Sequence, residues 1–301
     1  MIKAKIIADS ICAGSRITTF ELEYPRFIHG ELMTHRMFSR NAASSRAIPV
    51  DTMMQLIEDS PAKPVEWGMN QSGMQAKELH TSSAGCEWVW CMAAKDAVAS
   101  AKALQKQGLH KQIVNRVLEP FQVMKTVVTA TEYANWFYLR NHSDAQPEIH
   151  VLAEKMLEAF NSSTPVELKS GEWHLPYVGV NVEGTGRISY HLEDEEGDVT
   201  QMVHLEDALK ISASCCAQVS YRKQDDSLEK ALKIWDMLVG MKPVHASPFE
   251  HQATPMEDNC DSDTRFWEEG VTHSDRTGCK WSGNFKGWIQ HRQLIKGHVV
   301  S

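Results

Sequence analysis

The sequence predicts a fold of the α/β (α+β) class, in which strands and helices both contribute to the core. Three observations predict it. Phe20, Leu22 and Tyr24 alternate with polar residues, which is the period-two pattern of a half-buried strand. Residues 122–129 are rich in β-branched side chains, which favour a second strand. Residues 227–240 place apolar side chains at three-to-four-residue spacing, which is typical of an amphipathic helix.

The N-terminal part predicts two strands, over residues 2–8 and 16–24, followed by a helix. Pro25 ends the second strand, and apolar residues recur from 27 to 38 at helical spacing. Residues 41–45 are small and turn-prone, so we expect the helix to end at a loop. The helix and loop are expected to bring together His35, Arg36, Asn41, Ser44 and Arg46.

Helices and loops are expected to dominate the rest of the chain. Asp51 is expected to be the N-cap of a short helix over 51–58, and a loop rich in Gly, Ser, Gln and Met follows over 61–84. Turn signals between 168 and 205 predict an exposed meander. Further helices are expected over 86–107, 109–118, from Pro147 onward, 205–218 and 227–240.

The composition indicates a globular protein that binds neither nucleic acid nor a membrane. The 301 residues are 42% hydrophobic and carry a net charge of -8, whereas general nucleic-acid binding needs a basic surface. The chain has no apolar run of about 20 residues, the length that spans a bilayer. Seven cysteines without a C-x-x-C pair indicate a reduced, cytoplasmic protein, in the host cytoplasm if the chain is phage-encoded.

Residues 31–46 concentrate guanidinium and hydroxyl groups in one short segment. Arginine presents a planar fork of donors that matches phosphate, and serines with free amides form anion-binding turns. Against the acidic background, this segment favours a small anionic ligand, although a solvated basic helix face is an equally simple interpretation. Residues 135–148 form a second polar cluster that includes Asn135 and Arg140. The spacing of His, Cys and carboxylates fits no metal site, and no P-loop or dinucleotide fingerprint is present.

Several short motifs together resemble those of the flavin-dependent thymidylate synthases. The family signature is Arg-His-Arg, seven residues and Ser, and Thr34 takes the place of its first arginine here. The matching residues are His35, Arg36, Asn41, Ser44 and Arg46; Arg116; Leu139, Arg140, Ser143, Ala145, Gln146, Glu148 and Ile149; Val219, Ser220 and Tyr221; and Ser247, Pro248, Phe249, Glu250 and His251.

The resemblance implies a single domain over 1–301 with a mixed central sheet flanked by helices. The last two motifs precede the first in the common form of the family, so the chain resembles a divergent, circularly permuted, phage-type member. A meander is then inserted at 168–205, and an extension covers 257–301. Residues 257–270 of the extension are acidic and loop-like, whereas residues 284–298 are basic with aromatic side chains that we expect to be buried. By itself this end predicts a terminal strand or helix with a solvated charged face.

The resemblance also implies a homotetramer with shared active sites and assigns roles to individual residues. FAD would be contacted by His35, Arg36, Met37, Asn41, Asn135, Ser220, Ser247 and Glu250. The pyrimidine deoxynucleoside monophosphate would be held by Glu31, Ser44, Ser45, Arg46, Arg116 and Arg140. Arg140 and Ser44 would serve the reaction, Arg140 by polarising the ring carbonyl and Ser44 by binding without attacking. Methylene-tetrahydrofolate would donate the carbon unit, and NADPH is an expected reductant.

Departures from the family pattern leave the product open. Glu31 stands where glutamine is usual, and a carboxylate favours an amino-bearing base, so dCMP is an alternative to dUMP. Thymidylate synthesis from dUMP is the default, with dCMP or dUMP 5-hydroxymethylation as the alternative in the same class. A non-catalytic nucleotide-binding protein is the alternative in a different class. The further replacements are Thr34, Ala42 and Asp144.

Overall fold

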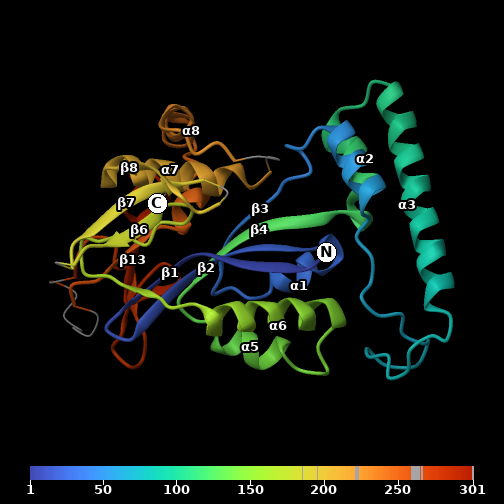
Figure 1. The fold of residues 1–301 in the computed structure, drawn as a ribbon, viewed down its shortest axis with the longest axis horizontal. Helices are drawn as coiled ribbons and strands as arrows, with labels where there is room; N and C mark the ends of the chain where they lie inside the picture. The colour runs from blue at the N-terminus through green and yellow to red at the C-terminus, as the bar shows by residue number, and fades with distance from the viewer. Residues whose placement is uncertain (185, 195, 221–223, 259–264, 266, 300–301) are drawn as a thin grey trace.

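A mixed five-stranded sheet lies at the centre of the molecule (Figure 1). The computed structural model describes residues 1–184, 186–194, 196–220, 224–258, 265 and 267–299. The strand order is β3-β4-β2-β1-β5; neighbouring strands are antiparallel except β1 and β5, which are parallel. The strands are β1 (Lys3–Cys12), β2 (Ser15–Pro25), β3 (Ser39–Ala42), β4 (Val123–Ala130) and β5 (Val166–Glu167).

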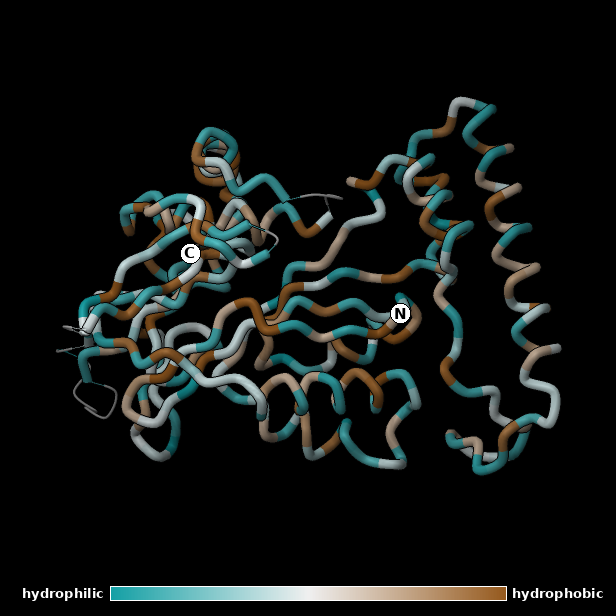
Figure 2. The backbone as a smooth tube through the Cα atoms, viewed as in Figure 1, coloured by the Kyte–Doolittle hydropathy of each residue, from teal (hydrophilic) through white to brown (hydrophobic). Residues whose placement is uncertain are grey.

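Helices α5 (Ala134–Arg140) and α6 (Pro147–Ser162) cover one face of this sheet (Figure 1). Phe20 and Leu22 from β2 pack with Trp136 and Leu152 in one buried cluster. Pro147 occupies the first turn of α6, as predicted, and Gln146 caps the helix by accepting from the amide of Ile149. The main core therefore lies between the sheet and these two helices. Figure 2 shows apolar residues concentrated along the central strands.

Helices α2 (Val50–Asp59) and α3 (Ser83–Lys106) stand beside one end of the sheet (Figure 1). The predicted loop between them is confirmed, and α3 ends just before Gly108, which has a positive φ of 79°. Asp51 is not the N-cap of α2, because the helix begins at Val50 after Pro49; its carboxylate instead accepts from the side chain of Gln105.

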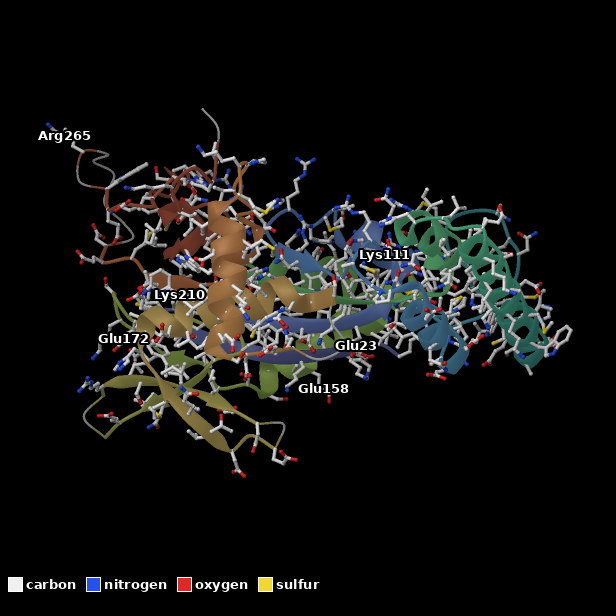
Figure 3. All side chains as sticks on the ribbon, turned by 90° about the horizontal axis from the view of Figure 1, so that it is seen from above. Glu23, Lys111, Glu158, Glu172, Lys210 and Arg265 are labelled. Atoms are coloured by element: carbon white, nitrogen blue, oxygen red, sulfur yellow. The ribbon has the colours of Figure 1, made fainter. Side chains whose placement is uncertain are left out.

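The C-terminal half forms a second layer of elements. The predicted meander is confirmed as an antiparallel sheet. Residues 199–202 and the described turn residues are exposed as expected, whereas Tyr190 and Leu192 pack against Ala208 and Ile211. Figure 3 shows Lys111 in the half that carries α2 and α3, and Arg265 at the far end of the other half. The elements are β6 (Gly179–Val182), β7 (Ile188–Glu193), β8 (Val199–Val203), α7 (Leu205–Ala217), η3 (Gln218–Ser220) and α8 (Leu228–Gly240).

The C-terminal residues are part of the core, which agrees with the expectation that their aromatic side chains are buried. Phe285 and Trp288 have no exposed surface and pack with Ile17 and Ala253. Trp288 pairs with Pro255 in the two-stranded sheet of β13 and β9. The elements are η4 (Ser247–Glu250), β9 (Ala253–Pro255), β10 (His273–Ser274), β11 (Lys280–Ser282), β12 (Phe285–Lys286), β13 (Trp288–Gln290) and η6 (His291–Leu294).

Two predicted helices are shorter than expected. The helix expected over 27–38 consists only of the 3₁₀ turn η1 (Arg26–Ile28) and the single turn α1 (His29–Leu32). Of its periodic residues, Ile28, Leu32 and Phe38 are buried, whereas Phe27, Met33 and Met37 are exposed, so only part of the expected apolar face is covered. The helix expected over 109–118 is split into α4 (Lys111–Val114) and the 3₁₀ helix η2 (Asn115–Phe121), which contains Pro120.

No helix within the described part of the chain has the length and apolarity that a membrane crossing needs. The described side chains also form no cluster of three or more His, Cys, Asp or Glu that would hold a metal ion.

Candidate active site

Strand β3 organises the candidate site because it is the outer strand of the central sheet. It pairs with β4 on one side, with Asn41 opposite Val127, and no strand of the sheet lies on its other side. Asn41 was predicted in a loop and lies in this strand instead. The chain reaches β3 from α1 through turns and leaves it through the turn that carries Ser44 and Arg46. The predicted site residues gather around this strand in four groups.

The first group joins Arg140 to Glu31 and His35. Arg140 ends α5, and its Nη1 lies 2.5 Å from Glu31 Oε1 at the end of α1. The Nε of the same guanidinium donates to His35 Nε2 at 3.0 Å. Residues more than a hundred positions apart therefore hold one half-buried guanidinium in place, and the structure brings together these three predicted residues.

His35 is held in its neutral form. Burial, followed by the positive charges of Arg140 and Arg40, lowers the pKa of His35 to about 4. Its ring packs edge-on against Trp136, with 4.7 Å between centroids. Arg40 also fixes the turn, because its Nη1 donates to the carbonyl oxygens of Met33 and His35. A neutral imidazole can accept from Arg140 without competing with it for an anion.

The second group joins the turn after β3 to the end of α7. The amide of Ser44 donates to Ser220 Oγ at 2.8 Å, and Asn41 Nδ2 donates to the carbonyl of Cys216 at 3.2 Å. Ser220 lies in η3, directly after α7. The motif residue Tyr221 lies outside the described residues. This pairing shows that residues about 175 positions apart in the sequence form one side of the site.

The third group centres on Glu119, which the sequence analysis did not assign. Its carboxylate accepts from Ser45 Oγ at 3.0 Å and lies 3.1 Å from Arg26 and 3.5 Å from Arg116. The side chain of Asn115 donates to the carbonyl of Ser45 at 2.7 Å. One carboxylate is thus shared by two arginines, and Arg116 stays largely exposed.

The fourth group comes from η4 and the C-terminal segment. The carboxylate of Glu250 forms an ion pair with Arg292, and Gln290 Nε2 donates to the backbone carbonyl of Glu250 at 3.3 Å. Gln290 Nε2 also donates to Ser39 Oγ at 3.1 Å, so η4 is connected to β3 through the last strand. Ser247 begins η4 and is exposed.

The side chains of the remaining predicted residues are exposed and, among the described residues, are not joined to these groups. Arg36, Met37, Arg46 and Asn135 are all solvent-facing. In the part of the chain that the structure describes, the guanidinium groups of Arg36 and Arg46 have no hydrogen-bond or ion-pair partner. Likewise, no bond between described residues joins the Ser44–Arg46 turn to Arg140. The turn that carries Ser44 and Arg46 and the group around Arg140 therefore form two sides of the site next to β3, and no bond between described residues joins these two sides.

A separate cleft of about 530 Å³ lies between the 61–84 loop and α3. Its walls include Trp67, Trp90 and Val89, with His80 and Cys86 at the first turn of the helix. None of the predicted site residues lines it.

The sequence analysis missed Glu119, Gln290 and Arg292. Glu119 lies three residues after Arg116, so helical spacing offered a signal for that pair. Gln290 and Arg292 carried no comparable signal, because their partners lie 251 and 42 positions away.

Comparison with known proteins shows which family this chain matches. A family model described as thymidylate synthase complementing protein matches residues 16–166. No curated protein matches the sequence. Solved structures with a similar chain path include the UMP/dUMP methylase PolB from Streptomyces cacaoi, bound with 5-Br dUMP. It is 18% identical, with a TM-score of 0.44, and the match covers 53% of this chain and 90% of that one.

Another similar structure is the flavin-dependent thymidylate synthase ThyX from Helicobacter pylori, complexed with FAD and dUMP. It is 18% identical with a TM-score of 0.34, and the match covers 48% of this chain and 67% of that one. The family model carries the assignment. It spans half of the chain and includes both the segment from His35 to Arg46 and the motif that contains Arg140. The chain therefore belongs to the family of the thymidylate synthase complementing proteins, the flavin-dependent thymidylate synthases.

Proposed function

We propose that this enzyme transfers a one-carbon unit from methylene-tetrahydrofolate to C5 of a pyrimidine deoxynucleotide, with dUMP to dTMP as the default reaction. One observation supports the proposal above the others. The surface around β3 carries more guanidinium than carboxylate, because Arg36 and Arg46 have no anionic partner among the described residues and Arg116 shares Glu119 with Arg26. Uncompensated arginines on a chain of net charge -8 suit phosphate ligands.

The residues around β3 fit FAD as a cofactor. Arg36 offers an exposed guanidinium for its diphosphate, and Asn41 and Ser220 offer amide and hydroxyl groups on the same side of the strand. The further residues proposed to hold the cofactor are His35, Met37, Asn135, Ser247 and Glu250. When bound, the flavin supplies the redox chemistry of the reaction.

The nucleotide phosphate is proposed to bind at the turn after β3. Ser44, Ser45 and Arg46 present hydroxyl and guanidinium groups there, and Arg116 reaches the same turn through Glu119. Arg140 is proposed to bind the pyrimidine ring, where a fixed positive charge draws electron density toward the ring oxygen. Glu31 and His35 hold Arg140 in place for this role.

The two described cysteines at the end of α7, next to Asn41, are buried. Cys216 contributes its backbone carbonyl to Asn41, and burial raises the pKa of its thiol well above the ordinary value. Burial also raises the pKa of the neighbouring Cys215 to about 12. A thiol that stays protonated is a poor nucleophile, so these two cysteines do not favour a covalent enzyme adduct. Their chemistry agrees with a reaction in which Ser44 binds and no protein nucleophile attacks.

We further propose a cytoplasmic homotetramer whose active sites are shared between subunits, with NADPH as the reductant. Large apolar side chains such as Trp88 on α3 and Tyr138 on α5 are exposed, which suits burial against another subunit. Among the described residues, the side chains of Arg46 and Asn135 likewise have no hydrogen-bond or ion-pair partner that would explain their placement.

A second candidate is hydroxymethylation or methylation of dCMP. Glu31 favours it, because an ionised carboxylate only accepts hydrogen bonds and cytosine carries an amino group where uracil carries a carbonyl. Glu31 accepts from Arg140 through Oε1. The Glu31→Gln variant supplies a donor as well as an acceptor, so it should raise the ratio of dUMP to dCMP turnover if Glu31 selects the base.

The purified chain tests the proposal directly. It should bind FAD with the yellow colour and absorbance of a flavoprotein. With methylene-tetrahydrofolate and reductant, it should convert dUMP or dCMP into a product that mass spectrometry identifies as the methyl or hydroxymethyl nucleotide. A hydroxymethyl product would replace the default with the alternative. A colourless protein that takes up no FAD but binds nucleotide would show a non-catalytic binder.

A further inference from the structure

A buried hydrogen-bond hub connects the C-terminal segment to the start of β3. Its centre is Gln290 on β13, which is 2% exposed. The Nε2 of Gln290 lies 2.9 Å from Asn284 Oδ1, 3.1 Å from Ser39 Oγ and 3.3 Å from the carbonyl oxygen of Glu250. One side-chain amide thus meets a residue of the neighbouring turn and two segments that lie 40 and 251 positions away.

Asn284 completes the hub from the turn between β11 and β12. Ser39 Oγ donates to Asn284 Oδ1 at 3.1 Å, and Asn284 Nδ2 donates to the carbonyl of Met37 at 2.8 Å. The segment from Met37 to Ser39 is therefore held at two points. This segment leads directly from His35 and Arg36 into β3.

The hub is itself fixed in place. The backbone amide of Gln290 donates to Ser282 Oγ at 3.0 Å, and the Ser282 hydroxyl donates to the carbonyl of Gly270 at 2.6 Å. Gln290 Oε1 accepts from Gln293 at 3.3 Å. Trp288, two residues before Gln290, is fully buried. A packed and fully hydrogen-bonded support holds a site more precisely than a loop does.

The same segment also fixes the side chain of Glu250. Arg292 forms an ion pair with its carboxylate, while Gln290 holds its backbone. Since β3 has a strand neighbour on one side only, this C-terminal segment supplies the hydrogen bonds that support its start. None of the segment lies within residues 16–166, which the family model matches.

We propose that Gln290 and Asn284 are positioning residues for the flavin site. They act through Met37, Ser39 and Glu250 and do not touch the cofactor themselves. This inference rests on the proposed function, because Met37 and Glu250 matter in this way only if FAD binds beside them. It gives the C-terminal segment a role in the reaction beyond its contribution to the core.

Gln290→Met tests the role with little change in side-chain volume, because it removes the amide but keeps an unbranched chain of similar length. We expect the FAD Kd to rise at least tenfold, as measured by flavin fluorescence titration. Amide hydrogen exchange at residues 37–42 should also become faster. Gln293→Met is the matched control: it removes only the bond to Gln290 Oε1 and should leave both readouts within about twofold of the wild type.

Asn284→Asp provides a second variant at a half-buried position, where folding is less at risk. It keeps the acceptor for Ser39 and Gln290 but loses the donor to Met37, so FAD binding should weaken about fivefold. If the wild type binds FAD and both variants keep its FAD Kd and its amide hydrogen exchange at residues 37–42, the positioning role alone is overturned. A wild-type protein that binds no FAD would overturn the proposed function and this inference together.

Discussion

Arg140 and Glu31 form an ion pair, with Nη1 2.5 Å from Oε1, while the Nε of the same guanidinium donates to His35 at 3.0 Å. The guanidinium is therefore held from both edges by residues of another segment. A charge held in this way needs little reorganisation when charge develops on a bound ring, which is the basis of electrostatic catalysis.

Replacing this guanidinium should abolish most turnover without removing the cofactor. For Arg140→Ala, we expect kcat to fall by about 10²–10³-fold, because one preorganised electrostatic contact is lost. The FAD Kd should stay within about threefold of the wild type, since His35 is the one residue proposed to bind FAD that is joined to Arg140 by a described hydrogen bond. Steady-state kinetics and flavin titration measure the two effects. Arg187→Ala, on the exposed meander, is the control; near wild-type turnover in Arg140→Ala would remove this residue from the reaction.

Ser44 is expected to bind the nucleotide and not to attack it. Ser44→Ala should raise the KM for the nucleotide about tenfold, because a hydroxyl that faces the phosphate is lost, while kcat stays within about threefold. The backbone amide of Ser44 still donates to Ser220, so the turn should keep its shape. Loss of kcat by several orders of magnitude at saturating nucleotide would instead indicate a serine nucleophile.

A buried chain of side chains predicts how stability depends on pH. His174 lies within 3.0 Å of Ser10 and 2.8 Å of Thr19, and Thr19 connects through Thr129 to His251. Burial lowers the pKa values of His174 and His251 to about 3. The folded state therefore keeps both rings neutral, whereas the unfolded chain protonates them below a pH of about 6.5.

Stability contributed by these histidines should be complete above about pH 6.5 and should be lost as the pH falls toward 3. Each histidine should lower the free energy of unfolding by about 2 kcal/mol between pH 7 and pH 5. Urea unfolding at the two pH values measures the difference. In His251→Asn, which cannot titrate, that difference should shrink by about 2 kcal/mol. An unchanged difference would show that His251 is not a source of the acid sensitivity.

The buried C-terminal segment predicts a large effect of truncating Trp288. Trp288→Ala should lower the free energy of unfolding by about 3–5 kcal/mol, because it opens a cavity beside Phe285 and Ile17. Met74→Ala is the control: its side chain is fully exposed in the 61–84 loop, so the change should be within about 1 kcal/mol. Urea unfolding compares the two. Equal effects would mean that the C-terminal segment is not part of the core.

The long elements could be predicted from the sequence because their periodicity matches their burial. The alternation of Phe20, Leu22 and Tyr24 corresponds to a strand whose apolar residues are all buried. The pattern of Phe27, Met33 and Met37 failed to predict structure because spacing alone does not tell whether a face is covered, and these residues are exposed. Local patterns report what a segment can form, whereas burial depends on segments far along the chain.

The residues of the candidate site likewise fall into those that the sequence predicts and those that it does not. His35 and Arg140 were found because they belong to motifs, and the structure joins them. The carboxylate of Glu119 and the amide of Gln290 are ordinary in the sequence and gain importance only from partners that folding brings near. The circular permutation stays a prediction. Ser220 and Glu250, from the last two motifs in the sequence, do lie beside the segment that carries the first motif.

The support of β3 by Gln290 and Asn284 has a consequence for synthesis on the ribosome. The first 170 residues emerge early and contain the whole five-stranded sheet, but the start of its outer strand lacks its hydrogen bonds to Asn284 and Gln290 until residues 284–290 leave the exit tunnel. At about 5–20 residues per second, the nascent sheet spends several seconds in that incomplete state. Cofactor capture is therefore expected only after residues 284–290 have been synthesised and have joined the sheet.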